Sequence, residues 1–266
     1  MFQMLTGAIV FIYGICIGSF LNVCIYRIPI SKSIVSPGSC CSSCNKPIRF
    51  YDNIPLLSYF FLRGKCRACN APISFRYPAI ELLTGIFSLL TYLKFGLTIS
   101  GIIYFAFIAT LIVISFIDFD HRIIPDIISL PGILVFFILS FFVKNMAFVE
   151  ALKFSILGLL SGGGSLFAVA WMYHAITGKD GMGGGDIKLL AMMGPLIGWQ
   201  GVFFTIFSSS AIGVICGVIA MIPQKQMSGK FAIPFGPFLS VGAVLYIFFG
   251  NQIIQWYLTT FMLRQI

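Results

Sequence analysis

The sequence predicts an all-α integral membrane protein, a polytopic bundle of about eight transmembrane helices with a cytoplasmic four-cysteine, zinc-ribbon-like loop. Of the 266 residues, 59% are hydrophobic and 9% are charged, whereas soluble domains carry about 25% charged residues. Several apolar runs are long enough to cross the roughly 30 Å hydrocarbon core of a bilayer. Two Cys-x-x-Cys pairs share one basic loop near the amino terminus.

The apolar runs place the spans in order along the chain. The first run has no basic residue before Arg27 and is longer than the apolar core of a signal peptide, so we expect a retained helix. The tail after residue 249 is too short to assign as a ninth span, and its Trp256 and Tyr257 suit a membrane interface. The predicted spans are 4–26, 78–94, 98–117, 127–143, 151–175, 186–200, 202–222 and 231–249.

Basic residues set the expected orientation and argue against one class of partner. The net charge is +9, but nearly half of the 17 Lys and Arg residues lie between positions 27 and 76. Lys and Arg beside spans mark the cytoplasmic side, so the amino terminus is expected outside the cytoplasm. We therefore expect membrane lipid, and no nucleic acid, as a partner. The loop residues are Arg27, Lys32, Lys46, Arg49, Arg63, Lys65, Arg67 and Arg76.

Two matched cysteine pairs in the loop 27–77 predict a metal site. The segments "CCSSCNKPI" and "GKCRACNAPI" both place Asn-x-Pro-Ile after the pair, so we expect two similar turns. Such turns about twenty residues apart suit tetrahedral Zn²⁺, because each supplies two thiolates. The alternatives are reduced thiols without metal, or disulfides, which a cytoplasmic loop disfavours; Cys40 could also replace the first ligand. The predicted zinc ligands are Cys41, Cys44, Cys66 and Cys69.

Apart from Asp52, the aspartates lie near the cytoplasmic ends of predicted spans. Asp118 ends an apolar run, so a continuing helix keeps it in the last turn at the membrane edge. Acidic groups at such positions are costly and usually functional. Structural roles explain the next three aspartates better: a solvated turn for Asp120, a helix cap for Asp126 and a polar loop for Asp180.

Asp186 stands in the segment "GMGGGDIKLLAMMG", directly after three glycines. Gly183, Gly184 and Gly185 allow the backbone to bend sharply and to approach another chain closely. Lys188, two positions further on, lies roughly on the opposite side of a helix and is badly placed to neutralise Asp186. A simple helix cap is the alternative, although capping requires no run of glycines.

Two carboxyls on separate helices at one membrane face suggest a pair that shares a proton. Like charge and low dielectric keep one acid of such a pair protonated. The ionised acid then takes a proton from water while the protonated acid donates a hydrogen bond to a peptide carbonyl. We predict that Asp118 and Asp186 form this catalytic pair, and the sequence does not decide which one is protonated.

Several segments in order resemble one family, the bacterial type IV prepilin peptidases, which are GxGD-type aspartic proteases. Asp118 opens the family's Asp-x5-[Leu/Ile]-Pro-Asp pattern, which Pro125 and Asp126 complete, and Asp186 closes its Gly-x-Gly-Asp pattern. The family usually has Pro after the first cysteine of the loop, where this chain has Ser42. The matching segments are "GSFLNVCIYRIP" (18–29), the paired cysteine loop, "SFRYPAIELLTG" (74–85), "IDFDHRIIPD" (117–126), "GGGDIKLLAMMG" (183–194) and "IPFGPFL" (233–239).

The resemblance implies two activities in the bacterial inner membrane, with the active site at the cytoplasmic face. One cleaves the basic leader of type IV prepilins and type II secretion pseudopilins, and the other methylates the new amino terminus with S-adenosylmethionine. It implies that residues 1–95, with the loop 27–77, serve methylation and that residues 96–266 form the peptidase domain. Gly183, Gly185, Lys188, Pro125 and Asp126 are expected to support the aspartates. The sequence has no glycine-rich dinucleotide-type motif for the methyl donor.

Three other functions share some of these features. A proton-coupled transporter would place acids near mid-bilayer and show two similar halves, and the sequence shows neither. A zinc-binding membrane scaffold would not need Asp186 for function. An archaeal preflagellin-type peptidase would share the aspartate motifs without needing the cysteine loop.

Overall fold

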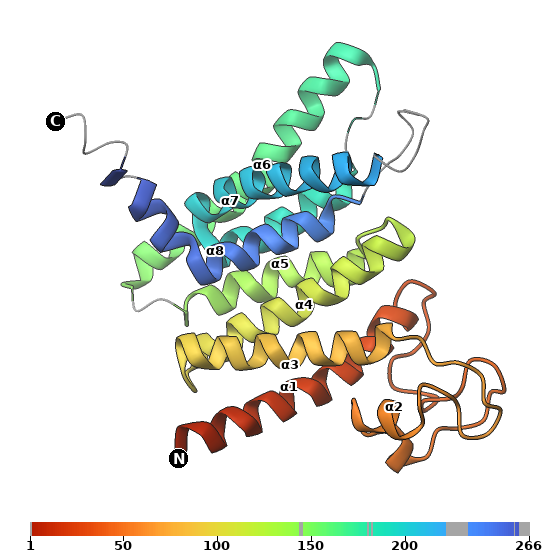
Figure 1. Cartoon of the computed structure of the whole chain (residues 1–266). Helices are drawn as coiled ribbons and strands as arrows, with labels where there is room; N and C mark the ends of the chain where they lie inside the picture. Colours follow the sequence, from red (N-terminus) through yellow and green to blue (C-terminus); the bar gives the residue numbers. More distant parts are fainter. Residues whose placement is uncertain are drawn as a thin grey trace. The chain divides into compact units, whose positions relative to one another are not determined.

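The computed structural model describes residues 2–143, 146–179, 181, 183–221, 234–257 and 259–260. Its regular elements in these ranges are helices, with two isolated β-bridges in the cysteine loop, so the predicted all-α class is confirmed. The chain divides into two compact units, Met1–Ile117 and Asp118–Ile266. The elements drawn in Figure 1 are α1 (Phe2–Arg27), η1 (Phe50–Asn53), α2 (Leu57–Phe61), α3 (Arg76–Phe95), α4 (Ile99–His121), α5 (Asp126–Ser140), α6 (Phe148–Thr177), α7 (Gly184–Met221) and α8 (Gly236–Tyr257).

Six described helices, α1, α3, α4, α6, α7 and α8, are long and apolar enough to cross a membrane. The predicted span 127–143 corresponds to α5, a shorter apolar helix of 15 residues. The predicted span 186–200 and the described part of 202–222 both lie in α7, which Gly198 divides into two helical segments. Gly198 has φ 71° and ψ 173°, a conformation that side chains disfavour. The last predicted span, 231–249, begins outside the described residues and continues in α8 as far as Tyr257.

In the first unit, α1 packs along α3 through small residues (Figure 1). A Cβ atom added to Gly18 would lie 2.7 Å from the Cα atom of Glu81. The amide of Asn22 donates to the carbonyl of Tyr77 at 3.1 Å, and the hydroxyl of Ser88 donates to the carbonyl of Val10 at 3.0 Å. In lipid, close packing and such polar contacts hold helices together, because no hydrophobic force drives them to associate.

In the second unit, α7 contacts α5, α6 and α8. Gly158 of α6 and Gly194 of α7 face one another so closely that a Cβ atom on either would overlap the carbonyl group of the other. Gly162 meets the backbone at Leu190 in the same way. This glycine contact fixes α7 against α6, and α7 carries Asp186 in its first turn.

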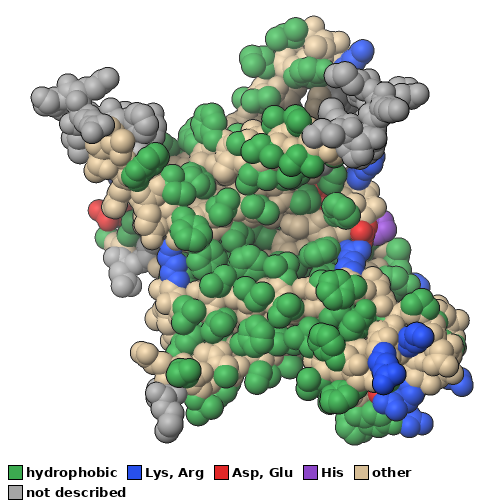
Figure 2. All heavy atoms as spheres, viewed as in Figure 1, with side chains coloured by type: hydrophobic (Ala, Val, Ile, Leu, Met, Phe, Trp, Pro, Cys, Tyr) green, Lys and Arg blue, Asp and Glu red, His purple; other side chains and the backbone are tan. Residues whose placement is uncertain are grey.

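Large apolar side chains remain exposed along the helices of each unit, for example Ile9 and Leu93 in the first and Leu160 and Phe207 in the second. On the face drawn in Figure 2, apolar side chains cover the helical parts, whereas Lys and Arg gather over the cysteine loop. Lipid tails suit such a surface, whereas water disfavours it. The chain is therefore a multi-pass membrane protein.

Candidate functional site

Asp118 lies in the last turn of α4 and is 5% exposed. The helix ends just beyond it, where the N–H of Arg122 donates to the carbonyl of Asp118 at 2.8 Å and Arg122 itself has φ 55°. The negative end of the α4 dipole therefore lies close to the Asp118 carboxyl. This arrangement alone disfavours a negative charge on Asp118.

A backbone donor from another helix contacts this carboxyl. The N–H of Gly236, the first residue of α8, donates to Oδ2 of Asp118 at 3.0 Å. A Cβ atom at position 236 would lie 2.6 Å from the same oxygen, so a side chain there would require the carboxyl to shift. The sequence segment "IPFGPFL" predicts no role for Gly236, although the glycine stands between two Pro-Phe steps.

Asp186 is the third residue of α7 and is partly exposed. Its backbone N–H donates to the carbonyl of Gly183 at 3.3 Å. Its carboxyl is close enough to that of Asp118 for the two to interact electrostatically. The structure thus brings the two predicted acids together in the second unit, although they are far apart in the sequence.

The glycines before Asp186 matter for the room that they leave, because their backbone conformations are ordinary. Helix α7 already includes Gly184 and Gly185, and neither they nor Gly183 adopts a left-handed backbone. A Cβ atom on Gly185 would lie 3.0 Å from the Cβ atom of Ile124, whereas one on Gly184 would meet nothing within 4 Å. Gly185 therefore packs closely on Ile124, which a side chain at position 185 would push aside, and Gly184 borders open space.

Lys188 pairs with Asp126 instead of Asp186. Its Nζ atom lies 2.7 Å from Oδ1 and 2.9 Å from Oδ2 of Asp126. The prediction that Asp126 caps α5 was wrong, because Pro125 occupies the cap position and Asp126 begins the helix. The carbonyl of Pro125 accepts the N–H groups of Ile128 and Ser129, and the ion pair joins the first turns of α5 and α7.

The cysteine loop of the first unit contains the two similar turns that its sequence predicts. In the first, the N–H of Cys41 donates to the carbonyl of Lys46 and the N–H of Asn45 donates back to the carbonyl of Cys41. The second repeats both bonds twenty-five residues later, and each turn closes with an isolated antiparallel bridge. The bridges join Cys40 to Pro47 and Lys65 to Pro72.

The four predicted ligands form one cluster. One Sγ atom from each of Cys41, Cys44, Cys66 and Cys69 lies within 4.8 Å of the others, and the Sγ atoms of Cys41 and Cys69 are 3.8 Å apart. Thiolates about 2.3 Å from a tetrahedral Zn²⁺ ion have nearly this separation. Backbone N–H groups of Cys44 and Ser43 lower the pKa of Cys41 to about 6. The cluster therefore fits Zn²⁺, and it excludes Cys40.

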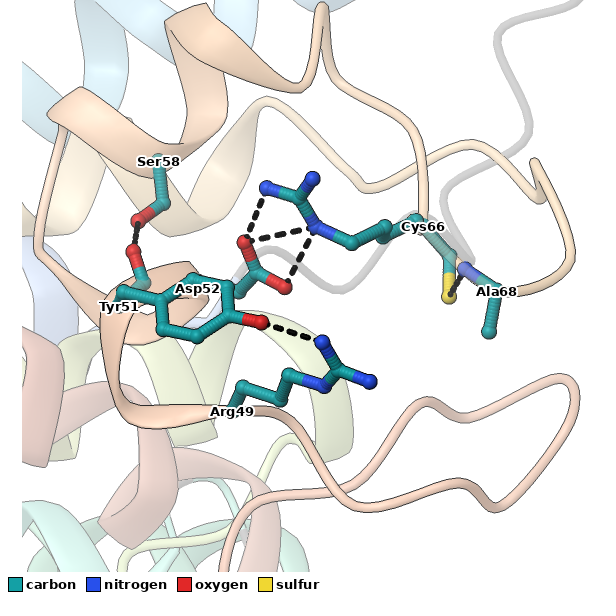
Figure 3. Close-up of polar contacts among 7 residues, drawn as sticks. Arg49, Tyr51, Asp52, Ser58, Cys66 and Ala68 are labelled. Carbon is teal, nitrogen blue, oxygen red and sulfur yellow. Dashed lines mark hydrogen bonds and ion pairs between the residues drawn. The ribbon is translucent and has the colours of Figure 1, made fainter.

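A compact ion pair lies beside the cluster. The guanidinium of Arg67 donates to both carboxylate oxygens of Asp52, at 2.7–3.1 Å, and hydrogen bonding to Arg67 lowers the pKa of Asp52. Arg49 donates to the hydroxyl of Tyr51. Figure 3 shows Arg49, Tyr51 and Asp52 on the segment that faces Cys66 and Ala68. These contacts tie η1 to the second cysteine turn.

Glu81 connects the loop to helix α3. This buried carboxylate accepts the N–H of Leu56 at 2.8 Å. Leu56 has φ 59° and ψ −53°, an uncommon conformation for a leucine. Glu81 thereby holds the turn before α2.

Comparison with known proteins places the chain in a family. A family model described as the bacterial peptidase A24 N-terminal domain matches residues 12–95, and one described as the type IV leader peptidase family matches residues 105–218. Curated proteins named prepilin leader peptidase/N-methyltransferase are similar over most of their length. The one from Aeromonas hydrophila is 35% identical, covering 96% of this chain and 94% of the relative.

Two further relatives carry the same name. The protein from Pseudomonas aeruginosa is 37% identical over 92% of this chain and 91% of its own length, and that from Neisseria gonorrhoeae is 36% identical over 93% of each. No solved structure shows a significant match. With both family models matched in order and these identities over nearly the full length, the chain belongs to the type IV leader peptidase family.

Proposed function

We propose that this chain is a membrane aspartic endopeptidase that cleaves the leader of type IV prepilins and type II secretion pseudopilins and then methylates the new amino terminus. The names of its relatives support both activities. The observation that carries the peptidase role is the pair of carboxyls from Asp118 and Asp186 at the ends of α4 and α7, next to the Gly236 amide. These acids lie at helix ends, which disfavours a transport site at mid-bilayer.

The pair performs general acid–base hydrolysis without a covalent intermediate. One ionised carboxyl takes a proton from water, whose oxygen bonds to the scissile carbonyl carbon, while the protonated carboxyl donates its proton to the carbonyl oxygen. The C–N bond then breaks. The amine leaves with the proton taken from water, and the carbonyl oxygen returns the other proton to its carboxyl.

The site suits a bond at the membrane edge. A prepilin carries a basic leader directly before an apolar helix, so its scissile bond lies where α4 ends and α7 begins. The backbone there must leave its helical hydrogen bonds to be cut. Gly183 and Gly184 are exposed, and no side chain lies within 4 Å of a Cβ position on Gly184. These glycines leave room for a substrate backbone.

The first unit supports methylation in this proposal. Residues 1–95, with the loop 27–77, form the methylation region, and residues 96–266 form the peptidase domain. The four clustered cysteines hold a structural Zn²⁺ ion. S-adenosylmethionine supplies the methyl group. The basic loop between positions 27 and 76 supports a location in the cell inner membrane with the loop and the aspartates at the cytoplasmic face.

Mass spectrometry of a prepilin incubated with purified enzyme and S-adenosylmethionine tests both activities separately. Asp118→Ala and Asp186→Ala should each abolish leader loss, whereas Glu150→Ala, an exposed acid at the start of α6, should leave it unchanged. Cys44→Ser should remove the added methyl group while cleavage continues. Leader loss that survives either aspartate change would end the peptidase assignment.

A further inference from the structure

We propose that the Gly236 amide makes Asp118 the ionised member of the pair, so that Asp118 is the general base and Asp186 the protonated acid. The inference rests on the proposed peptidase function and assigns the two roles that the sequence leaves open. In it Gly236 is a positioning residue, because it acts on the reaction through Asp118.

The two carboxyls differ in their hydrogen bonds. Asp118 accepts the Gly236 N–H at 3.0 Å in a buried setting. The Asp186 carboxyl accepts no hydrogen bond from any residue in the described part of the chain. A donor aimed at a carboxyl stabilises its charged form. A backbone amide can only donate, so it offers no acceptor to a proton on the oxygen that it contacts.

Helix ends act on both acids: at Asp118 the two contributions offset one another, whereas at Asp186 the helix dipole favours the charged form. Asp186 lies in the first turn of α7, where the dipole favours an anion, and Asp118 lies at the unfavourable end of α4 but next to the favourable end of α8. A direct hydrogen bond to a charged acceptor contributes more than a helix dipole does. The Gly236 amide therefore decides which carboxyl carries the charge.

The surrounding charges do not reverse this assignment. At the end of α4 and just beyond it, the exposed residues Asp120, His121 and Arg122 follow Asp118. On α5 and α7, Asp126 and Lys188 neutralise one another. Helix α8 carries no ionisable Asp, Glu, Lys, Arg or His between Gly236 and Tyr257.

The assignment fixes the direction of each proton transfer. Asp118 takes the proton from the attacking water, and that proton later leaves with the amine of the mature pilin. Asp186 gives its proton to the carbonyl oxygen and recovers it when the C–N bond breaks. Each carboxyl ends the cycle in its starting state, so no oxidant or further reactant is required.

Infrared spectroscopy of the protein in lipid at neutral pH tests the assignment without using activity. All spectra are recorded in a Glu81→Gln background, which removes another buried carboxyl. We expect a protonated-carboxyl stretching band in the parent protein. Asp186→Asn should remove this band, because it replaces the carboxyl that carries the proton with an amide of similar shape. A band that persists in Asp186→Asn, or no band in the parent, would overturn the assignment.

A matched pair of variants tests the amide itself. Gly236→Ala adds a Cβ atom and keeps the N–H, whereas Gly236→Pro adds the same atom and removes the N–H. Proline is tolerated at the first position of a helix. Without the donor, Asp118 takes up its proton at higher pH, so the acidic limb of cleavage in Gly236→Pro should lie about one pH unit above that of Gly236→Ala. The same limb in both variants would overturn the role of the amide.

Failure of this assignment of roles can be distinguished from failure of the proposed peptidase function. Cleavage by Asp118→Ala or Asp186→Ala removes the peptidase assignment and this inference with it. Cleavage that requires both aspartates, together with a carboxyl band that survives Asp186→Asn, removes only the assignment of roles.

Discussion

In the cysteine loop of the first unit, the four clustered thiols come from two short turns that repeat the same backbone hydrogen bonds. In the second unit, the two carboxyls and the backbone amide of the site come from the ends of α4, α7 and α8, at positions 118, 186 and 236. Local spacing builds the first cluster, and helix packing builds the second. Changes that break one should therefore leave the other intact.

The largest expected effect is loss of metal from the loop. Cys44→Ser removes one of the four proposed ligands, and structural Zn²⁺ can contribute on the order of 10 kcal/mol to folding of a small domain. We expect metal analysis to show loss of Zn²⁺ and mass spectrometry to show loss of methylation, with cleavage retained.

Cys40→Ser is the matched control, since Cys40 lies in the same loop but outside the cluster. It should keep both Zn²⁺ and methylation. Equal metal loss in the two variants would contradict the ligand set.

The next effect should appear at the start of α7. Gly185→Val pushes on Ile124, which a Cβ atom would already approach to 3.0 Å, and Gly184→Val meets open space. Overpacking displaces the backbone, and a displacement of about 1 Å can lower an enzymatic rate by roughly 10²-fold. Single-turnover cleavage should fall about tenfold or more in Gly185→Val, with membrane insertion intact.

Gly184→Val separates two explanations of the glycine run. If packing on Ile124 sets the effect, Gly184→Val cleaves faster than Gly185→Val. Equal losses would mean that substrate approach, and not packing, explains the glycines, and normal turnover in Gly185→Val would remove both explanations.

A smaller effect is expected where Glu81 holds the Leu56 amide. Glu81→Ala removes a charged acceptor, whereas Glu81→Gln keeps an oxygen in place. A hydrogen bond to a charged group contributes about 1.5–3 kcal/mol to stability. Hydrogen exchange at the Leu56 amide should accelerate in the alanine variant and much less in the glutamine variant. Cleavage should be unchanged in both, and a cleavage defect would contradict the independence of the two regions.

The smallest effect should come from the ion pair between Lys188 and Asp126. Their side chains are 38% and 57% exposed, and such pairs contribute about 0.2–1 kcal/mol. A double-mutant cycle with Lys188→Ala and Asp126→Ala, measured by thermal unfolding in detergent, should give a coupling free energy in this range. A value near zero would show that the pair does not help to hold α5 against α7.

The sequence predicts the parts of the molecule that depend on local pattern. Apolar runs identify the membrane helices, and the spacing of Cys41, Cys44, Cys66 and Cys69 predicts the cluster that the loop forms. The apolar run continues through Gly198, so the sequence predicts the break in α7 a few residues too late. No periodic signal marks that residue as left-handed.

Contacts between distant segments were harder to predict. The partner of Asp126 is Lys188, and nothing in either local sequence indicates that α5 and α7 begin side by side. Likewise, a backbone amide has no side chain to recognise in a sequence, so the contact from Gly236 to Asp118 emerged only from the folded chain.

The central claim is that Asp118 and Asp186 act on one water molecule as a unit. The most direct measurement compares single-turnover cleavage by Asp118→Ala, Asp186→Ala and the double variant. The effects of substituting residues that act together are strongly non-additive. Each single change should lower the rate by about 10³-fold or more, and the double variant should be no slower than the slower single variant. Losses that multiply in the double variant, or a single variant that retains near-normal cleavage, would contradict the account.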